Sequence, residues 1–200
     1  WKNDLALFGH TLQVTKKNAL AHNQMGLAFF EANRNKEALD HFDRAILLDH
    51  NQDSAYNNRG AVYLRSGNYQ KALSDFNHAI SINPSYIKAY NNRANLYAQT
   101  GHHELAIDDL TKTIRLDPDY INGYYNRGLL FAKLGRYQPA LKDLDEAIRL
   151  KEDYADAYNL KAAVYLNQND MVSGCRDAKK ACILGNCATM NAAQTRGLCR

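Results

Sequence analysis

Apolar and small residues recur at the spacing of one helix face in two consecutive segments between residues 53 and 86. The first segment places Tyr56, Gly60 and Tyr63 on one face, and the second places Ala72, Phe76, Ala79 and Ile80 on one face. Gly67 lies between the two segments as a helix stop. Asn83-Pro84 ends the second segment, because proline cannot continue a helix and disfavours helical backbone in the residue before it. The pattern predicts a helical hairpin.

The hairpin pattern returns along the chain with a fixed period. The stretch AYNNRG at 55–60 recurs as AYNNRA at 89–94 and as GYYNRG at 123–128. A small residue also recurs wherever the two helices of a hairpin must approach closely. These residues are Gly26, Gly60, Ala94, Gly128 and Ala162 in the first helix, and Ala38, Ala72, Ala106, Ala140 and Gly174 in the second. A fixed period of this kind is typical of repeat proteins, in which hairpins bury a continuous core only by stacking.

A helix-turn-helix of about 34 residues that carries an aromatic residue, Gly/Ala, Tyr, Ala, Phe/Leu, Ala and Pro in this order resembles the tetratricopeptide repeat. The matching units are 19–52, 53–86, 87–120, 121–154 and 155–188. The resemblance implies an all-α fold, a right-handed superhelical solenoid of antiparallel helix pairs whose first helices line a concave groove. We expect 1–18 to be the second helix of a truncated repeat and 189–200 to be a C-terminal capping helix. The whole chain would then form one continuous solenoid domain.

The N-terminal segment carries a second resemblance. Residues 1–26, WKNDLALFGHTLQVTKKNALAHNQMG, are similar to the junction in some bacterial membrane-anchored, glycosyltransferase-like proteins in which repeats follow a membrane region. Trp1, Leu5, Phe8 and Leu12 have the spacing of one amphipathic helix face. We expect the chain, which starts with Trp1, to be a processed form or a piece of a longer protein. The lost partner helix would leave an apolar patch, through which the protein can self-associate.

Composition and charge argue against several classes of function. The formal net charge of +4 arises from 25 basic and 21 acidic residues mixed along the chain, without the basic stripe that nucleic acid demands. No apolar run approaches the ~20 residues that span a bilayer, so we expect no membrane insertion of this segment. No glycine-rich phosphate loop, nucleophile elbow or paired-carboxylate pocket is present, and the seven histidines are scattered. We therefore expect a non-enzymatic protein without a cofactor or metal.

Side-chain amides form the candidate ligand surface. They occupy a stripe of the first helices that is rotated away from the buried stripe and is expected to face the groove or solvent. The predicted peptide-binding residues are Asn57, Asn58, Asn91, Asn92, Asn95, Tyr125 and Asn126, with Arg65, Lys88, Gln99 and Lys133 at the edge. Asn58, Asn92 and Asn126 resemble the asparagine ladder in the repeats of O-linked N-acetylglucosamine transferase. Because an amide offers both a donor and an acceptor, such a row can hold an extended peptide backbone. The alternative is that these asparagines are solvated polar residues.

The arginines of the repeated motif call for a structural interpretation. Arg59, Arg93 and Arg127 are each followed, at one constant spacing, by an acid in the second helix of the same hairpin, namely Asp75, Asp109 and Asp143. In the first unit Met25 replaces the arginine and His41 replaces the acid, and in the last unit the corresponding residues are Lys161 and Asp177. This covariation within one chain predicts ion pairs inside each hairpin rather than a ladder for an acidic ligand.

The four cysteines all follow residue 174. Cys175 and Cys182 are two helical turns apart on one predicted helix, which is too far for a mutual disulfide. If 189–200 folds back antiparallel about a turn near Cys187, Cys199 lies opposite Cys175, and we predict a Cys175–Cys199 disulfide. We expect Cys182 to be a small buried residue and Cys187 to be a free thiol, with a zinc site as the alternative. A disulfide would favour an oxidising compartment, whereas free thiols would leave the cytoplasm open.

Two functions remain in competition at this point. The first is a protein interaction scaffold that holds an extended peptide or a partner helix in the concave groove. The second is an assembly or spacer segment of a larger membrane-attached protein, which contacts partners or itself through the open N-terminal face. An RNA-reading helical repeat is a third possibility, against which the mixed charge argues.

Overall fold

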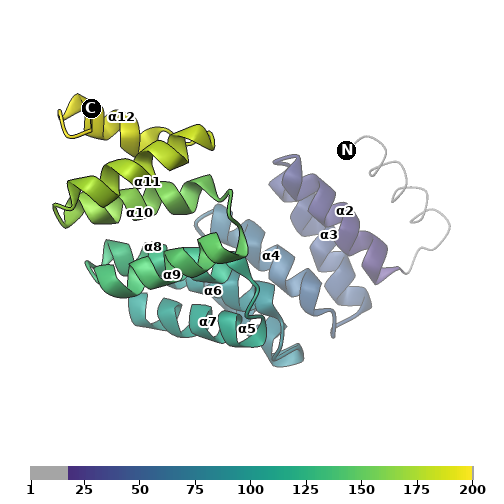
Figure 1. Ribbon diagram of the computed structural model, residues 1–200. Helices are drawn as coiled ribbons and strands as arrows, with labels where there is room; N and C mark the ends of the chain where they lie inside the picture. Colours follow the sequence, from purple (N-terminus) through teal and green to yellow (C-terminus); the bar gives the residue numbers. More distant parts are fainter. Residues whose placement is uncertain (1–17, 200) are drawn as a thin grey trace. The chain divides into compact units, whose positions relative to one another are not determined.

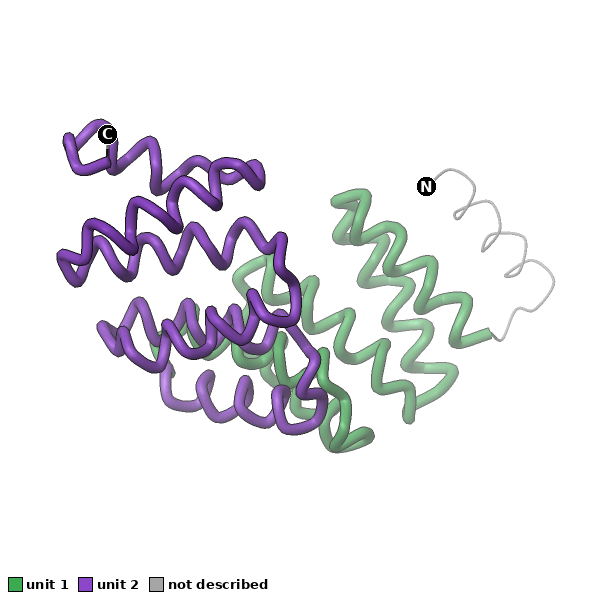
Figure 2. The backbone as a smooth tube through the Cα atoms, viewed as in Figure 1, with its two compact units in different colours: residues 1–102 green, residues 103–200 purple. Residues whose placement is uncertain are grey.

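The computed structural model describes residues 18–199, and this part of the chain contains eleven helices and no strand (Figure 1). The helices are α2 (Ala19–Glu31), α3 (Asn35–Leu48), α4 (Asp53–Arg65), α5 (Tyr69–Ile82), α6 (Ile87–Gln99), α7 (His103–Leu116), α8 (Ile121–Lys133), α9 (Tyr137–Leu150), α10 (Ala155–Asn167), α11 (Met171–Ile183) and α12 (Ala188–Thr195). They form two compact units, 1–102 and 103–200 (Figure 2). The expected all-helical fold class is confirmed.

Helical hairpins stacked side by side make up each unit. In the first unit α2 packs on α3 and α4 packs on α5, while α4 also contacts α2 and α3 of the preceding hairpin. Helix α6 then packs against α4 and α5. In the second unit α8–α9 and α10–α11 are hairpins, α7 packs on α8, and α12 covers α10 and α11 (Figure 1). In both units the first helix of a hairpin contacts the first helix of the next one.

The turn inside each hairpin requires one residue in the left-handed backbone region. Gly67, Gly101 and Gly135 occupy it with φ values of 73°, 81° and 70°. Asn33 and Asn169 take the same place in the first and last hairpins, with φ values of 60° and 62°. Glycine adopts this conformation without a Cβ penalty, and asparagine is among the few other residues that tolerate it. Local sequence alone therefore ends the first helix of each hairpin.

Close helix packing explains the small residue that recurs in the first helices. A Cβ built on Gly60 would lie 2.8 Å from Phe76 Cε1, well inside van der Waals contact. The phenyl ring therefore fills the space that the missing side chain leaves, and Phe76 is fully buried between Ala72 and Leu96. Gly26 and Phe42 repeat this contact in the first hairpin. Burial of an aromatic side chain of this size contributes roughly 1.5–3 kcal/mol to each of these two hairpins.

Two disulfides fix the C-terminal helix α12. The structure contains the expected Cys175–Cys199 disulfide, with a Cα–Cα distance of 5.5 Å, between α11 and the segment that follows α12. The expectations for the other two cysteines are wrong, because Cys182 and Cys187 form a second disulfide with a Cα–Cα distance of 4.0 Å. The reason is local. Cys187 is the N-cap of α12, and the tight turn after α11 brings Cys187 back to the last turn of α11, where Cys182 lies.

Candidate functional site

A chain of hydrogen bonds between side-chain amides crosses the first helices of the first unit. Asn58 Nδ2 on α4 donates to Asn23 Oδ1 on α2 at 3.0 Å, and Asn23 Nδ2 donates to Ser54 Oγ at 3.2 Å. Asn57 Nδ2 donates to Asn58 Oδ1 at 3.2 Å, and Asn92 Nδ2 on α6 donates to Asn57 Oδ1 at 2.9 Å. The amides therefore link three consecutive first helices.

The repeat itself produces this chain of amides. The contact from Asn92 to Asn57 is the contact from Asn58 to Asn23 moved along the chain by one repeat. Asn57 is only 3% exposed, so the prediction that it faces the groove or solvent is wrong. A helical wheel treats α4 alone, whereas the neighbouring first helix covers this position. Because a buried amide must keep its hydrogen bonds, Asn57 serves the packing of α4 against α6.

A cleft of about 440 Å³ lies between α4 and α6 in the first unit. Ala61 and Leu64 supply its apolar part, and the turn residue Gly67 and Tyr69 also line it. Its polar part comes from four predicted residues, Arg65, Asn92, Asn95 and Gln99. Gln99 Nε2 donates to Asn95 Oδ1 at 3.2 Å. Within the described residues, no partner engages Asn92 Oδ1, Asn95 Nδ2 or Gln99 Oε1, so one donor and two acceptors stay available to a ligand.

Arg65 borders this cleft but is held by the preceding hairpin. Its guanidinium lies 3.7 Å from the centroid of the Phe30 ring, a cation–π contact, and Nη2 donates to the Phe30 carbonyl oxygen at 2.9 Å. It also donates to the side-chain oxygens of Asn33 and Asn35. These acceptors are neutral, so the positive charge of Arg65 is oriented without being neutralised.

The remaining predicted residues do not line the cleft. Lys88 on α6 and Lys133 on α8 are exposed, and Asn91 and Asn126 are half-buried. The Tyr125 ring packs against Tyr154 with a centroid distance of 5.1 Å. Burial raises the pKa of both tyrosines, that of Tyr154 to about 12. A peptide-binding role for Lys88, Asn91, Tyr125, Asn126 and Lys133 stays a prediction.

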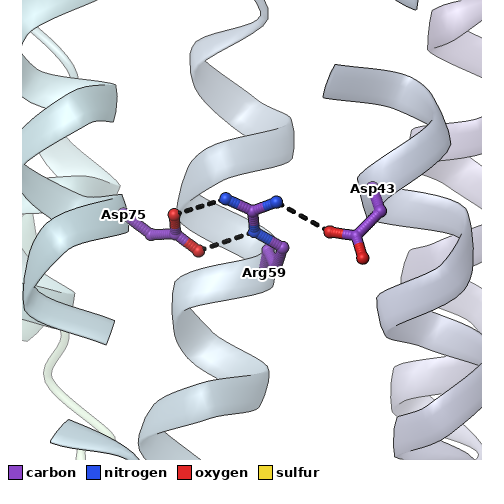
Figure 3. A network of polar contacts seen from close by, with 3 residues as sticks. All are labelled: Asp43, Arg59 and Asp75. Carbon is purple, nitrogen blue, oxygen red and sulfur yellow. Dashed lines mark hydrogen bonds and ion pairs between the residues drawn. The ribbon is translucent and has the colours of Figure 1, made fainter. Parts of the chain in front are cut away.

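Arg59 joins three helices through two carboxylates (Figure 3). It forms a bidentate contact with Asp75 on α5, with Nε–Oδ2 and Nη2–Oδ1 distances of 2.8 and 2.7 Å. Its third nitrogen, Nη1, donates to Asp43 Oδ1 on α3 of the preceding hairpin at 2.7 Å. Asp75 lies buried, with 6% of its side chain exposed, whereas 55% of the Asp43 side chain is exposed. The hydrogen bonds to Asp75 raise the pKa of Arg59 above its usual value; burial opposes this shift, and the contact with Asp43 adds to it.

The same arrangement recurs in the second unit. Arg127 is bidentate to Asp143 at 2.8 Å on each arm, and its Nη1 donates to Thr111 Oγ1 at 2.9 Å. Lys161 Nζ lies 2.6 Å from Asp145 and 3.6 Å from Asp177. The structural interpretation is confirmed for Arg59, Arg127 and Lys161. In each case the cation also binds a residue of the preceding hairpin. This second partner lies as many positions before the cation in the sequence as the paired acid lies after it, so the sequence contains a signal for the contact.

A histidine pair replaces the ion pair in the first hairpin. His22 Nδ1 and His41 Nδ1 are 3.1 Å apart, so one ring donates its proton to the other. Burial lowers the pKa of His41 to about 4, with the charges of His22 and Arg44 adding to the effect. Burial also lowers the pKa of His22. Both rings are therefore neutral at pH 7, and this hairpin lacks the charged link of its neighbours.

Among residues 18–199, no group of three or more histidine, cysteine or carboxylate side chains is placed to hold a metal ion. In the same part of the chain, no helix has both the length and the apolar character needed to cross a bilayer. The expected helix over 1–18 lies outside the described residues.

Several residues of the site were missed by the sequence analysis. Asn23 and Ser54 form the last hydrogen bond of the amide chain, and Tyr69 lines the cleft. The position of Asn23, one repeat before Asn57, would have revealed it, since the two asparagines are equivalent in consecutive repeats. Tyr69 has no such signal, because only the approach of α5 to the cleft brings it there.

Comparison with known proteins gives a consistent result. Family models described as "Tetratricopeptide repeat" match residues 54–86, 76–108 and 95–165, and one described as "TPR repeat" matches 26–67. Together these matches run without a gap from residue 26 to residue 165. Among curated protein sequences, no match to this chain was found.

Solved structures with the same fold cover nearly the whole chain. YrrB, "a TPR protein with an unusual peptide-binding site", has 18% identity and a TM-score of 0.70, over 94% of this chain and 97% of its own. PilF of Pseudomonas aeruginosa has 16% identity and a TM-score of 0.80, over 90% of this chain and 84% of its own. A thermophilic TPR protein of Thermus thermophilus has 20% identity and a TM-score of 0.70, over 90% of this chain and 98% of its own. The hairpin period, the packing and the matching family models together show that this chain belongs to the tetratricopeptide repeat family.

Proposed function

We propose that this protein is a non-enzymatic interaction scaffold and that the cleft between α4 and α6 holds an extended segment of a partner protein. The observation that carries the proposal is that Asn92 Oδ1, Asn95 Nδ2 and Gln99 Oε1 in that cleft have no partner among the described residues. A peptide in extended conformation presents N–H and C=O groups that such amides can pair without reading side chains. The similarity to YrrB, whose description names a peptide-binding site, supports the same class of function.

The charge of the cleft supports a neutral or acidic peptide rather than a basic segment. Among the described residues that line the cleft, Arg65 alone is charged, and its positive charge is oriented by neutral acceptors. A lysine-rich or arginine-rich segment would be repelled there at close range. The ligand segment is therefore neutral or acidic where it passes Arg65.

Two exposed residues provide the test of this proposal. Asn95 and Gln99 are exposed and their side chains bond to each other, so the double variant Asn95→Ala/Gln99→Ala leaves the buried amide chain intact. A peptide is first selected from a phage-displayed library of random linear peptides against the folded protein. Its affinity is then measured by fluorescence anisotropy. Loss of two hydrogen bonds of ~1 kcal/mol each predicts a weakening of roughly tenfold or more.

The matched control is Gln138→Ala, which removes an exposed amide on α9 that does not line the cleft. It is expected to leave the affinity unchanged. Selection of no peptide, or equal affinity for the double variant and the control, would rule out the cleft as the binding surface.

A second candidate is an assembly or spacer segment that associates through its N-terminal end. Leu20 on α2 is 59% exposed, and Leu47 on α3 is 72% exposed, so two large apolar side chains of the first described hairpin are open to contact with a partner. Under this alternative, Leu20→Glu/Leu47→Glu lowers the sedimentation coefficient at high protein concentration. A coefficient that is independent of concentration in the unaltered protein would exclude it.

A further inference from the structure

A second groove, which we call the cap groove, lies between α10 and α12 in the second unit and has a volume of about 290 Å³. Its apolar lining includes Ala163 and Leu166 from α10, Ala192 and Ala193 from α12, and Leu198. Arg196 and Asn167 are polar residues of the same lining. The volume is at the lower limit for small-ligand sites, so the groove suits about one amino-acid residue rather than a helix.

The cap groove occupies the repeat position of the cleft between α4 and α6. Residues 163, 166 and 167 are the equivalents of residues 61, 64 and 65 three repeats later. In the first unit the facing helix α6 supplies amides, whereas here α12 supplies alanine side chains. The same position in the repeat is therefore lined for an apolar group instead of a peptide backbone.

One uncompensated cation borders this apolar surface. Arg196 is exposed, and within residues 18–199 its guanidinium has no ion-pair or hydrogen-bond partner. The described residues that line the groove include no carboxylate. The polar groups at the other end of α12 are already used, because Thr189 N and Oγ1 donate to Asn159 Oδ1 and O at 2.9 and 3.1 Å. Charge complementarity thus calls for an anionic group close to an aliphatic one.

The wall formed by α12 depends on the disulfides. Helix α12 has 8 residues, of which only Ala193 is buried, and isolated helices of this length do not persist in water. Cys187 at its N-cap is bonded to Cys182, and Cys199 after its end is bonded to Cys175. Leu198 lies directly before Cys199, and its carbonyl oxygen is 3.5 Å from Cys175 Sγ. Reduction of both disulfides therefore leaves this outer wall held chiefly by the Thr189 hydrogen bonds and the burial of Ala193, which loosens the wall.

We propose that the cap groove binds the aliphatic C-terminal residue of a partner protein, with the side chain on the alanine surface and the α-carboxylate on Arg196, and that it does so only when both disulfides are formed. An acidic side chain next to the aliphatic residue in the ligand would not reach Arg196, because successive side chains of an extended peptide point to opposite sides. A terminal residue carries both groups itself, which matches a groove of single-residue size. This site is independent of the cleft between α4 and α6.

The test uses alanine methyl resonances of the oxidised full chain, labelled with ¹³C, and N-acetyl-leucine as the probe. The expected result is a saturable shift of the Ala163, Ala192 and Ala193 methyl signals with an apparent Kd in the millimolar range. N-acetyl-leucinamide, which lacks the carboxylate, and the variant Arg196→Gln should each raise the apparent Kd at least about fivefold, a change of ~1 kcal/mol, which is no more than a hydrogen bond to a charged group ordinarily contributes.

Two further arms complete the test. Reduction by a phosphine should abolish the saturable shift while the Ala61 methyl signal in the first unit keeps its position, which shows that the hairpins remain folded. Ala192→Phe, at an exposed position, should fill the groove and abolish binding without reduction. Absence of a saturable shift, equal binding of N-acetyl-leucinamide, or unchanged binding by the reduced protein would each overturn the proposal.

Discussion

Removal of the Arg59 guanidinium tests how much the contact between hairpins depends on a buried charge. In Arg59→Met the Asp75 carboxylate, of which 6% is exposed, loses both of its hydrogen bonds from arginine. Breaking a buried ion pair at one partner costs about 3–5 kcal/mol because the other charge stays desolvated. Arg59 itself is 19% exposed, so water relieves part of this cost and we expect a loss at the lower end of that range.

The other arm of the same guanidinium provides the matched control. Asp43→Ala removes only the 2.7 Å contact of Nη1 with a carboxylate that is 55% exposed. Exposed ion pairs contribute about 0.2–1 kcal/mol, so this variant should lose no more than that. The free energy of unfolding is measured at pH 7 by urea titration followed by circular dichroism. For a chain of this size, a loss of about 3 kcal/mol corresponds to a decrease in Tm of roughly 6–12 °C.

A double variant separates the buried charge from the lost packing. Arg59→Met/Asp75→Asn removes both charges, so it should be more stable than Arg59→Met alone even though it carries one more substitution. If Arg59→Met destabilises no more than Asp43→Ala, or if the double variant is the least stable of the three, the assignment of a buried and structurally essential charge to Asp75 is wrong.

The other predictions concern pH, redox state and the amide chain. Burial lowers the pKa of His22 and lowers that of His41 to about 4, so the unfolded chain binds more protons below pH ~6.5. Stability is therefore fully present above that pH and falls as the pH decreases to about 4; the His41 shift alone corresponds to about 3 kcal/mol, and partial exposure of the ring reduces the expected loss to about 2 kcal/mol. Met25→Arg/His41→Asp should remove or reverse this loss in urea titrations across that range. Cys175→Ser/Cys199→Ser removes a disulfide with a sequence separation of 24 and should lower the stability of the second unit by about 3 kcal/mol, measured by amide hydrogen exchange of α12. Thiol titration of the native protein without reductant should find no reactive cysteine. Asn57→Ala leaves Asn92 Nδ2 and Asn58 Oδ1 unpaired and should cost about 1–2 kcal/mol in thermal unfolding, and an effect under about 0.3 kcal/mol would contradict a structural role for the amide chain.

Much of this fold was predictable because its rules are local and repeated. A residue with positive φ recurs in the turn of every hairpin, the small residue faces a phenyl ring in the first two hairpins, and the acid follows an arginine in three of them, so one hairpin explains much of the next. Within the candidate site, Asn92, Asn95, Gln99 and Arg65 were all predicted, and all four line one cleft. The asparagine at position 57 was also predicted, but its surroundings were not.

The cysteines show a similar division. An antiparallel return of the chain places Cys175 opposite Cys199, which simple counting along two helices predicts. The second disulfide depends on the turn after α11, which brings Cys187 back to within 4.0 Å of Cys182 measured between Cα atoms. Counting residues along two straight helices does not predict where the chain between them turns, so it could not predict this disulfide.

The sequence by itself determined the period, the hairpins, the positions of their turns and the ion pairs of Arg59, Arg127 and Lys161 inside their own hairpins, because each of these depends on residues within one repeat. Only the tertiary structure decided that Asn57 is buried while Asn95 is exposed, that Asp43 and Thr111 receive the free arm of the next arginine, and that Arg65 is held by the preceding hairpin. All of these contacts join one hairpin to another. The pattern along one helix specifies which side chains share a face, but the helix that packs on that face determines whether they meet water, a ligand or each other.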